Sequence, residues 1–114
     1  MNMNHTARSI RLFRKVRNMN EEIRQEILAM SRTAHRLTEA AYQQDLSTRG
    51  DLGWIPKQRI LLADMALHLL QTSLEDGDLS EEGLKRNLFS ILTISDLFVN
   101  DHDLKAIADE LYPS

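Results

Sequence analysis

The sequence predicts an all-α fold: a small bundle of three long helices with short terminal helices, associating as a homodimer. Leucine and isoleucine supply 18 and 8 of the 114 residues, whereas aromatic residues make up 5% and there are only four glycines and two prolines. This composition favours helices over strands. Apolar side chains also recur at alternating spacings of three and four residues, the period of a helix with one apolar face. A chain of this length forms one domain.

The N-terminal segment, residues 1–18, is predicted to be a basic arm in front of a single helical domain, residues 19–114. The arm carries five basic side chains and no acidic one, so the rest of the chain has nine basic against seventeen acidic groups and a net charge of -8. Arg and Lys interrupt the apolar residues of the arm, which excludes a secretory signal. The longest charge-free stretch, 65–74, has ten residues, where a membrane span needs about 20. We therefore expect a cytoplasmic protein without membrane contact.

The first long helix is predicted to run from Asn20, as its N-cap, to about Gln44. An apolar stripe at spacings of 4, 3, 4, 3 and 4 gives this helix its main apolar face: Ile23, Ile27, Met30, Ala34, Leu37 and Ala41. A second line, Leu28, His35 and Tyr42, recurs every seven residues about 120° away, on an otherwise polar face. Glycines, a proline and other turn formers in 45–56 end the helix.

The second long helix is predicted from Lys57 to about Leu74, with Pro56 suited to its first position. Its strongly polar residues Asp64, His68 and Gln71 lie within an arc of roughly 60°, and apolar residues occupy most of the remainder. Such a helix needs partners on two sides. We predict a homodimer interface on one side, formed by Leu61, Leu62, Met65 and Leu69. The alternative is a central helix wrapped by the other three.

A third helix is predicted to start at Ser80, with a stripe running from Leu84 to Phe98. A short last helix starts at Asn100 or Asp101 and ends at Leu111. Several apolar or aromatic side chains are left on polar faces of the first and third helices, and together they predict a partner-binding surface. These residues are Phe89, Leu97, Leu28 and Tyr42.

No catalytic, cofactor or metal site is predicted, and we expect no enzyme. The chain has no cysteine, which excludes a disulfide scaffold, an iron–sulfur site and a thiol nucleophile. Its four histidines are 30 or more residues apart and none belongs to a zinc-binding HExxH motif. No glycine-rich phosphate loop is present.

Two stretches of the chain are MSRTAHRLTEAAY, from Met30 to Tyr42, and GWIPKQRILLADMALHLLQ, from Gly53 to Gln71. On these stretches the whole chain resembles the QslA-like quorum-sensing antiactivators; the looser resemblance to TraM covers only the helix order and the first long helix. The resemblance implies a helical homodimer that binds the ligand-binding domain of a LuxR-type transcription regulator. The inhibitor would occupy the regulator's own dimerisation surface, which prevents regulator dimerisation and DNA binding.

Two other classes of function remain open. The basic arm suits a small nucleic-acid-associated protein, although the negative charge of the rest of the chain would repel DNA, so we expect no direct nucleic-acid contact. A secretion chaperone or adaptor would also be a small acidic helical dimer. Only the captured partner distinguishes that class from an antiactivator.

Overall fold

The computed structural model describes residues 19–113, and these contain four α-helices and no strand, which confirms the all-α fold. The helices are α2 (Glu21–Gln44), α3 (Trp54–Leu74), α4 (Glu81–Ser95) and α5 (Leu104–Glu110). The predicted basic arm, residues 1–18, lies outside the described residues. None of the four helices combines the length and the apolar character needed to cross a bilayer.

Local signals set the start of two long helices as predicted. The Asn20 side chain accepts hydrogen bonds from the backbone N–H groups of Glu22 and Ile23, at 2.8 and 3.3 Å. Ser80 accepts one from Gly83 at 2.9 Å. Each cap pairs N–H groups that the first helical turn leaves without a partner.

Other predicted boundaries are shifted. Helix α3 begins at Trp54, so Pro56 is its third residue and not its first; a proline there removes no helical hydrogen bond, because N–H groups of the first turn have no acceptor in the helix. Helix α4 ends at Ser95, which leaves Phe98 in the following turn. The last helix is capped by Asp103, whose carboxylate accepts from the Ala106 N–H at 2.9 Å, and not by Asn100 or Asp101.

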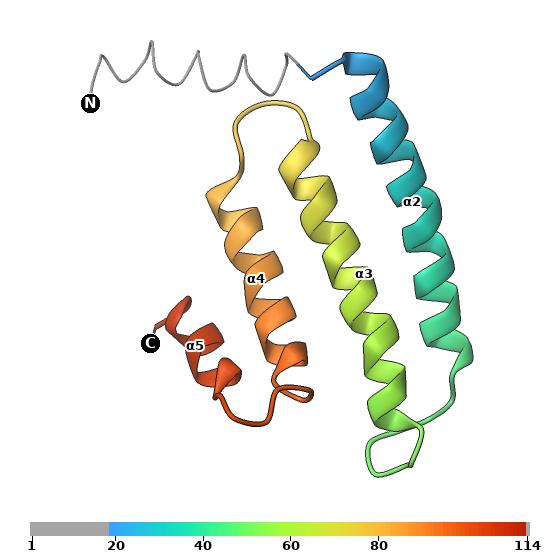
Figure 1. Cartoon of the computed structure of the whole chain (residues 1–114), viewed down its shortest axis with the longest axis vertical. Helices are drawn as coiled ribbons and strands as arrows, with labels where there is room; N and C mark the ends of the chain where they lie inside the picture. The colour runs from blue at the N-terminus through green and yellow to red at the C-terminus, as the bar shows by residue number, and fades with distance from the viewer. Residues whose placement is uncertain (1–18, 114) are drawn as a thin grey trace.

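Each helix packs mainly on the next one in the chain. Figure 1 shows α2, α3 and α4 side by side, with the short α5 beside α4. Helix α3 therefore lies between α2 and α4 and is not wrapped by all three other helices. The arrangement leaves little interior: among the described residues, the buried apolar side chains are Leu28, Ile94 and Ala108, and no large side chain is fully enclosed.

Candidate protein-binding surface

Helix α2 turns a row of mainly polar residues toward α3. We call this the inner row, and it consists of Arg24, Leu28, Ser31, His35, Thr38 and Tyr42. The Gln71 amide donates to the Ser31 hydroxyl at 3.2 Å. The Thr38 hydroxyl donates to Asp64 Oδ1 at 2.6 Å, and His35 Nδ1 lies 2.6 Å from the same oxygen. The polar arc of α3 thus faces α2, and the two helices meet along a polar seam.

Asp64 is the buried acid at the centre of this seam, 7% exposed. Burial by itself raises the pKa of its carboxyl group. Hydrogen bonds from Thr38 and His35, with the nearby imidazoles of His35 and His68, outweigh that effect and hold the pKa below its usual range. An ionised Asp64 accepts hydrogen bonds, so His35 Nδ1 is the donor in their contact.

The guanidinium of Arg24 closes the other end of the seam, with 3% of the residue exposed. It donates to the Leu74 carbonyl at the end of α3, and it lies 2.7 Å from carboxylate oxygens of Glu21 and of Asp76. Hydrogen bonds from Arg24 and Gln25 lower the pKa of Glu21 to about 2. The beginning of α2 is therefore tied to the end of α3 by a buried cation.

The main apolar stripe of α2 is consequently turned away from the seam and is exposed over much of its length, although Ile27 and Ala34 are half-buried. We call this stripe the outer face; its residues are Ile23, Ile27, Met30, Ala34, Leu37 and Ala41. Ile23, Met30 and Leu37 are 50%, 60% and 65% exposed. Full burial of such a side chain is worth about 1.5–3 kcal/mol, so covering these three would gain roughly 2 to 5 kcal/mol more. In this chain the most apolar row of α2 is therefore not the row that packs on α3, unlike the usual amphipathic surface helix, whose apolar row faces the core.

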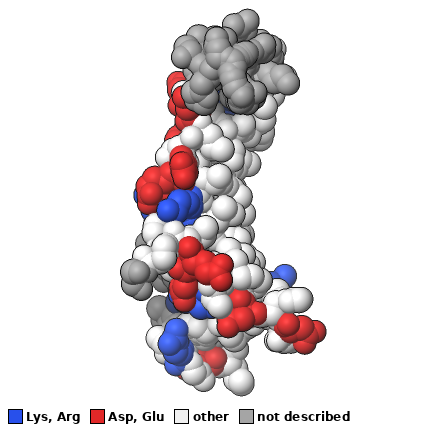
Figure 2. All heavy atoms as spheres, turned by 90° about the vertical axis from the view of Figure 1, so that its left-hand side faces the viewer, with Lys and Arg blue, Asp and Glu red and all other residues white. Residues whose placement is uncertain are grey.

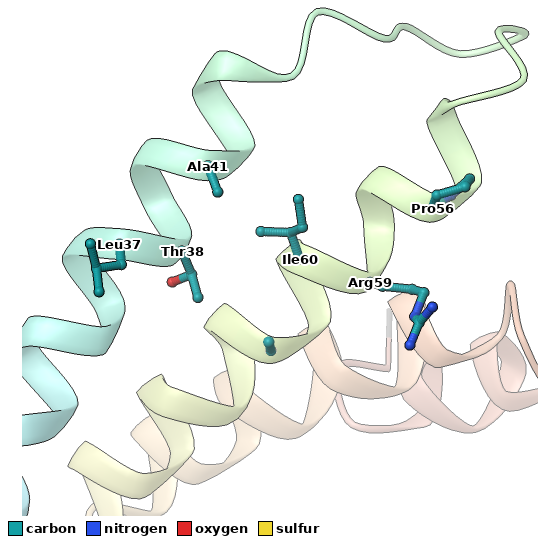
Figure 3. A pocket seen from close by; sticks show the side chains of 7 residues that line it. Leu37, Thr38, Ala41, Pro56, Arg59 and Ile60 are labelled. Carbon is teal, nitrogen blue, oxygen red and sulfur yellow. The ribbon is translucent and has the colours of Figure 1, made fainter.

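A groove runs along the outer face between α2 and α3. It has a volume of about 530 Å³, and Figure 3 shows its lining from both helices, with Leu37, Thr38 and Ala41 on one side and Pro56, Arg59 and Ile60 on the other. A second hollow of about 360 Å³ adjoins it along α2, lined by Met30, Ala34 and, shared with the first, Leu37. Together they form a long apolar surface with Arg59 and Glu26 at its borders.

The residues predicted for the dimer interface, Leu61, Leu62, Met65 and Leu69, are all half-buried. At 100° per residue, Met65 and Leu69 share a face of α3 with Thr72. A methyl group added at Gly83 of α4 would lie 3.4 Å from the Thr72 methyl carbon. Helix α4 thus packs along this face and covers part of it, while each predicted residue keeps some exposed surface.

The residues predicted for partner binding are not brought together. Leu28 is 8% exposed, buried between α2 and α3, and Tyr42 lies under the Lys57 ammonium, 4.5 Å from its ring centre. Phe89 packs edge-to-face on Tyr112, with 5.4 Å between ring centres. Leu97 is 38% exposed in the turn after α4, next to the exposed Phe98 and Val99.

The edge formed by α4 and α5 differs in character from the outer face. Figure 2 shows both acidic and basic side chains scattered over this edge. Lys85 and Lys105 lie over the Tyr112 and Phe89 rings, at 5.0 and 4.8 Å. The rings are therefore partly covered by cations of the same chain, and this edge presents a more mixed surface to a partner.

Among the described residues, one group of side chains has the atoms to hold a metal ion: His35, Asp64 and His68. The helical period of α3 places Asp64 and His68 on one polar arc but does not connect them to His35. The position of His35 in the inner row could indicate this contact. His35 follows the outer-face residue Ala34 by one position, so its side chain points about 100° away from that of Ala34. The sequence does not show which of the two rows of α2 faces α3, so it does not place His35 beside Asp64.

Comparison of the chain with protein-family models, with curated proteins and with solved structures gives no match.

Proposed function

We propose that this protein acts by binding another protein through the outer face of α2 and the adjoining groove. The observation that carries the proposal is the reversed packing of α2, which pairs its polar row within the chain and leaves Ile23, Met30 and Leu37 of its apolar row exposed. Exposed apolar patches with polar borders are typical of protein–protein interaction sites. The proposed action is binding alone, with no chemical change to either protein.

The partner we propose is a LuxR-type transcription regulator, bound through its ligand-binding domain. The resemblance to quorum-sensing antiactivators suggests this partner. A dimerisation surface that a second copy normally covers is itself apolar, so it suits the outer face and its groove. Arg59 and Glu26, at the borders, offer one charge of each sign to orient the complex.

The protein is also proposed to be a homodimer through Leu61, Leu62, Met65 and Leu69, whose exposed parts a second copy would bury. Sedimentation at micromolar concentration is expected to give a dimer, and Leu69→Arg to shift it toward monomer. A stable wild-type monomer would contradict this part of the proposal and leave the outer face unaffected.

The test of regulator binding mixes the purified full chain with a purified LuxR-type activator and follows complex formation by calorimetry. A band-shift assay follows release of the activator from DNA. Leu37→Glu places a charge at the centre of the outer face and is expected to weaken binding at least tenfold, in line with loss of a central interface residue. Leu79→Glu is the matched control, because Leu79 is 54% exposed in the loop before α4 and does not line the groove or the adjoining hollow. It should bind like the wild type.

Three outcomes would overturn the proposal. The first is the absence of a complex with any such activator. The second is a loss of binding in Phe89→Ala or Leu97→Ala with Leu37→Glu unaffected, which would move the surface to the α4 edge. The third is direct DNA binding by the protein alone with a steep salt dependence, which would favour a nucleic-acid-associated protein.

A further inference from the structure

A compact group of three possible metal ligands lies in the seam between α2 and α3. Asp64 and His68 are one helical turn apart on α3, and His35 reaches them from α2. His35 Nδ1 lies 2.6 Å from Asp64 Oδ1, and His68 Nε2 lies 3.4 Å from Asp64 Oδ2. The three ligand atoms lie within 4.8 Å of one another. Ligands of one tetrahedral zinc ion are about 3.4 Å apart, so the spacing of these three atoms is close to that of the ligands of one ion. Binding would displace the proton that His35 Nδ1 donates to Asp64, and the neutral ring would carry its proton on Nε2.

We propose that His35, Asp64 and His68 bind one divalent transition-metal ion, of which Zn²⁺ is the preferred example. Two imidazole nitrogens and one carboxylate oxygen suit Zn²⁺, Co²⁺ or Ni²⁺, whereas Ca²⁺ and Mg²⁺ prefer oxygen ligands alone. Three protein ligands leave a fourth position for water. The side chains of the two histidines are 28% and 38% exposed, so solvent and ions reach the group.

Thr38 supplies the outer support that metal sites need. Its hydroxyl donates to Asp64 Oδ1 at 2.6 Å and fixes the orientation of the carboxylate. The other oxygen, Oδ2, then points toward His68 and is available to an ion. Such hydrogen bonds to metal-binding carboxylates orient the ligand and strengthen binding.

An ion at this position would clamp α2 to α3 through one ligand on the first helix and two on the second. It would also neutralise the buried carboxylate, which the chain alone balances with hydrogen bonds. Because the ligands come from separate helices, binding favours the folded helix pair over the unfolded chain. This proposal is independent of the identity of the protein partner.

The test titrates Zn²⁺ into the metal-free full chain by calorimetry, and Co²⁺ while recording the visible absorption of a four-coordinate site. We expect one ion per chain. His68→Gln and His35→Gln are each expected to weaken binding at least tenfold. The matched control is the double variant His5→Gln/His102→Gln, which removes the other two histidines and should bind like the wild type. Because the double variant includes His102→Gln, it also tests whether the ion binds instead at His102, which lies between Asp101 and Asp103.

Thermal unfolding gives a second measurement that does not depend on any activity. Zn²⁺ should raise the unfolding midpoint of the wild type and of the double control by an amount that grows with the logarithm of the free Zn²⁺ concentration, and should leave His68→Gln nearly unchanged. Circular dichroism checks that His68→Gln is folded without metal. Absence of Zn²⁺ and Co²⁺ binding would overturn the proposal. Equal affinity in His68→Gln and the wild type, or loss of binding in the double control, would do the same.

Discussion

The Thr38 hydroxyl on α2 donates a 2.6 Å hydrogen bond to the Asp64 carboxylate on α3. This contact fixes the rotation of α2 about its own axis, because Thr38 follows the outer-face residue Leu37 by one position. A one-residue step rotates a helix by about 100°. The rotation that pairs Thr38 with the buried Asp64, Ser31 with Gln71 and Arg24 with the Leu74 carbonyl therefore turns Leu37 outward, where it is 65% exposed and lines the apolar groove.

We predict that Thr38→Val lowers the free energy of unfolding by about 1 to 2 kcal/mol. The substitution keeps the shape of the side chain but removes a hydrogen bond to a charged, buried group, and such bonds are worth about 1.5–3 kcal/mol when fully buried. Urea unfolding followed by circular dichroism measures the change. Thr33→Val, at an exposed position of the same helix, is the control and should change stability by less than about 0.5 kcal/mol. Equal effects of the two substitutions would contradict a role for the seam.

The pH dependence of stability should report on Asp64. Its pKa is lowered in the folded protein, so its contribution to stability is fully present above the unfolded value near 4 and is lost as the pH falls through the lower, folded value. We expect the wild type to lose stability below about pH 4, and Asp64→Asn to show a shallower loss. Unfolding curves recorded between pH 7 and pH 3 test this. Glu21, whose pKa is about 2, contributes in the same direction, so Glu21→Gln serves as a comparison. Parallel curves for Asp64→Asn and the wild type would rule out the role assigned to Asp64.

The helices and two of their caps could be predicted because their signals are local. Asn20 and Ser80 bond to N–H groups two or three residues away. The face that α2 turns toward α3 could not be predicted in this way, because it depends on pairs such as Thr38 with Asp64 and Ser31 with Gln71, which are 26 and 40 residues apart. The apolar stripe and the inner row have the same 4, 3, 4 spacing and are offset by one residue. Periodicity alone therefore fits both orientations. The prediction that Leu28 lies on a partner-binding surface did not anticipate that the inner row packs on α3, where Leu28 is buried.

The reversed orientation of α2 predicts a large loss of stability at one leucine of this helix and almost none at another. Leu28→Ala should lower the free energy of unfolding by about 2 kcal/mol or more, because it removes a side chain that is 8% exposed and leaves a cavity between α2 and α3. Leu37→Ala should change it by less than about 0.5 kcal/mol, because Leu37 is 65% exposed. Denaturant unfolding at low protein concentration, where association is minimal, makes the comparison. A larger loss at Leu37 than at Leu28 would mean that the outer face is the true core.

Asp96 is predicted to hold α5 against the end of α4. Its Oδ1 accepts hydrogen bonds from the backbone N–H groups of Leu104 and Lys105, at 2.9 and 3.2 Å. A helix of seven residues is too short to be stable alone, so it depends on such bonds and on the packing of Ala108, which is 0% exposed.

We expect Asp96→Ala to lower the free energy of unfolding by about 1 to 2 kcal/mol and to speed amide hydrogen exchange within 104–110. Asp96→Asn should have a smaller effect because its side-chain oxygen still accepts. Asp101→Ala, at an exposed position of the same loop, is the control. Unchanged exchange in Asp96→Ala would mean that Ala108 packing alone anchors the helix.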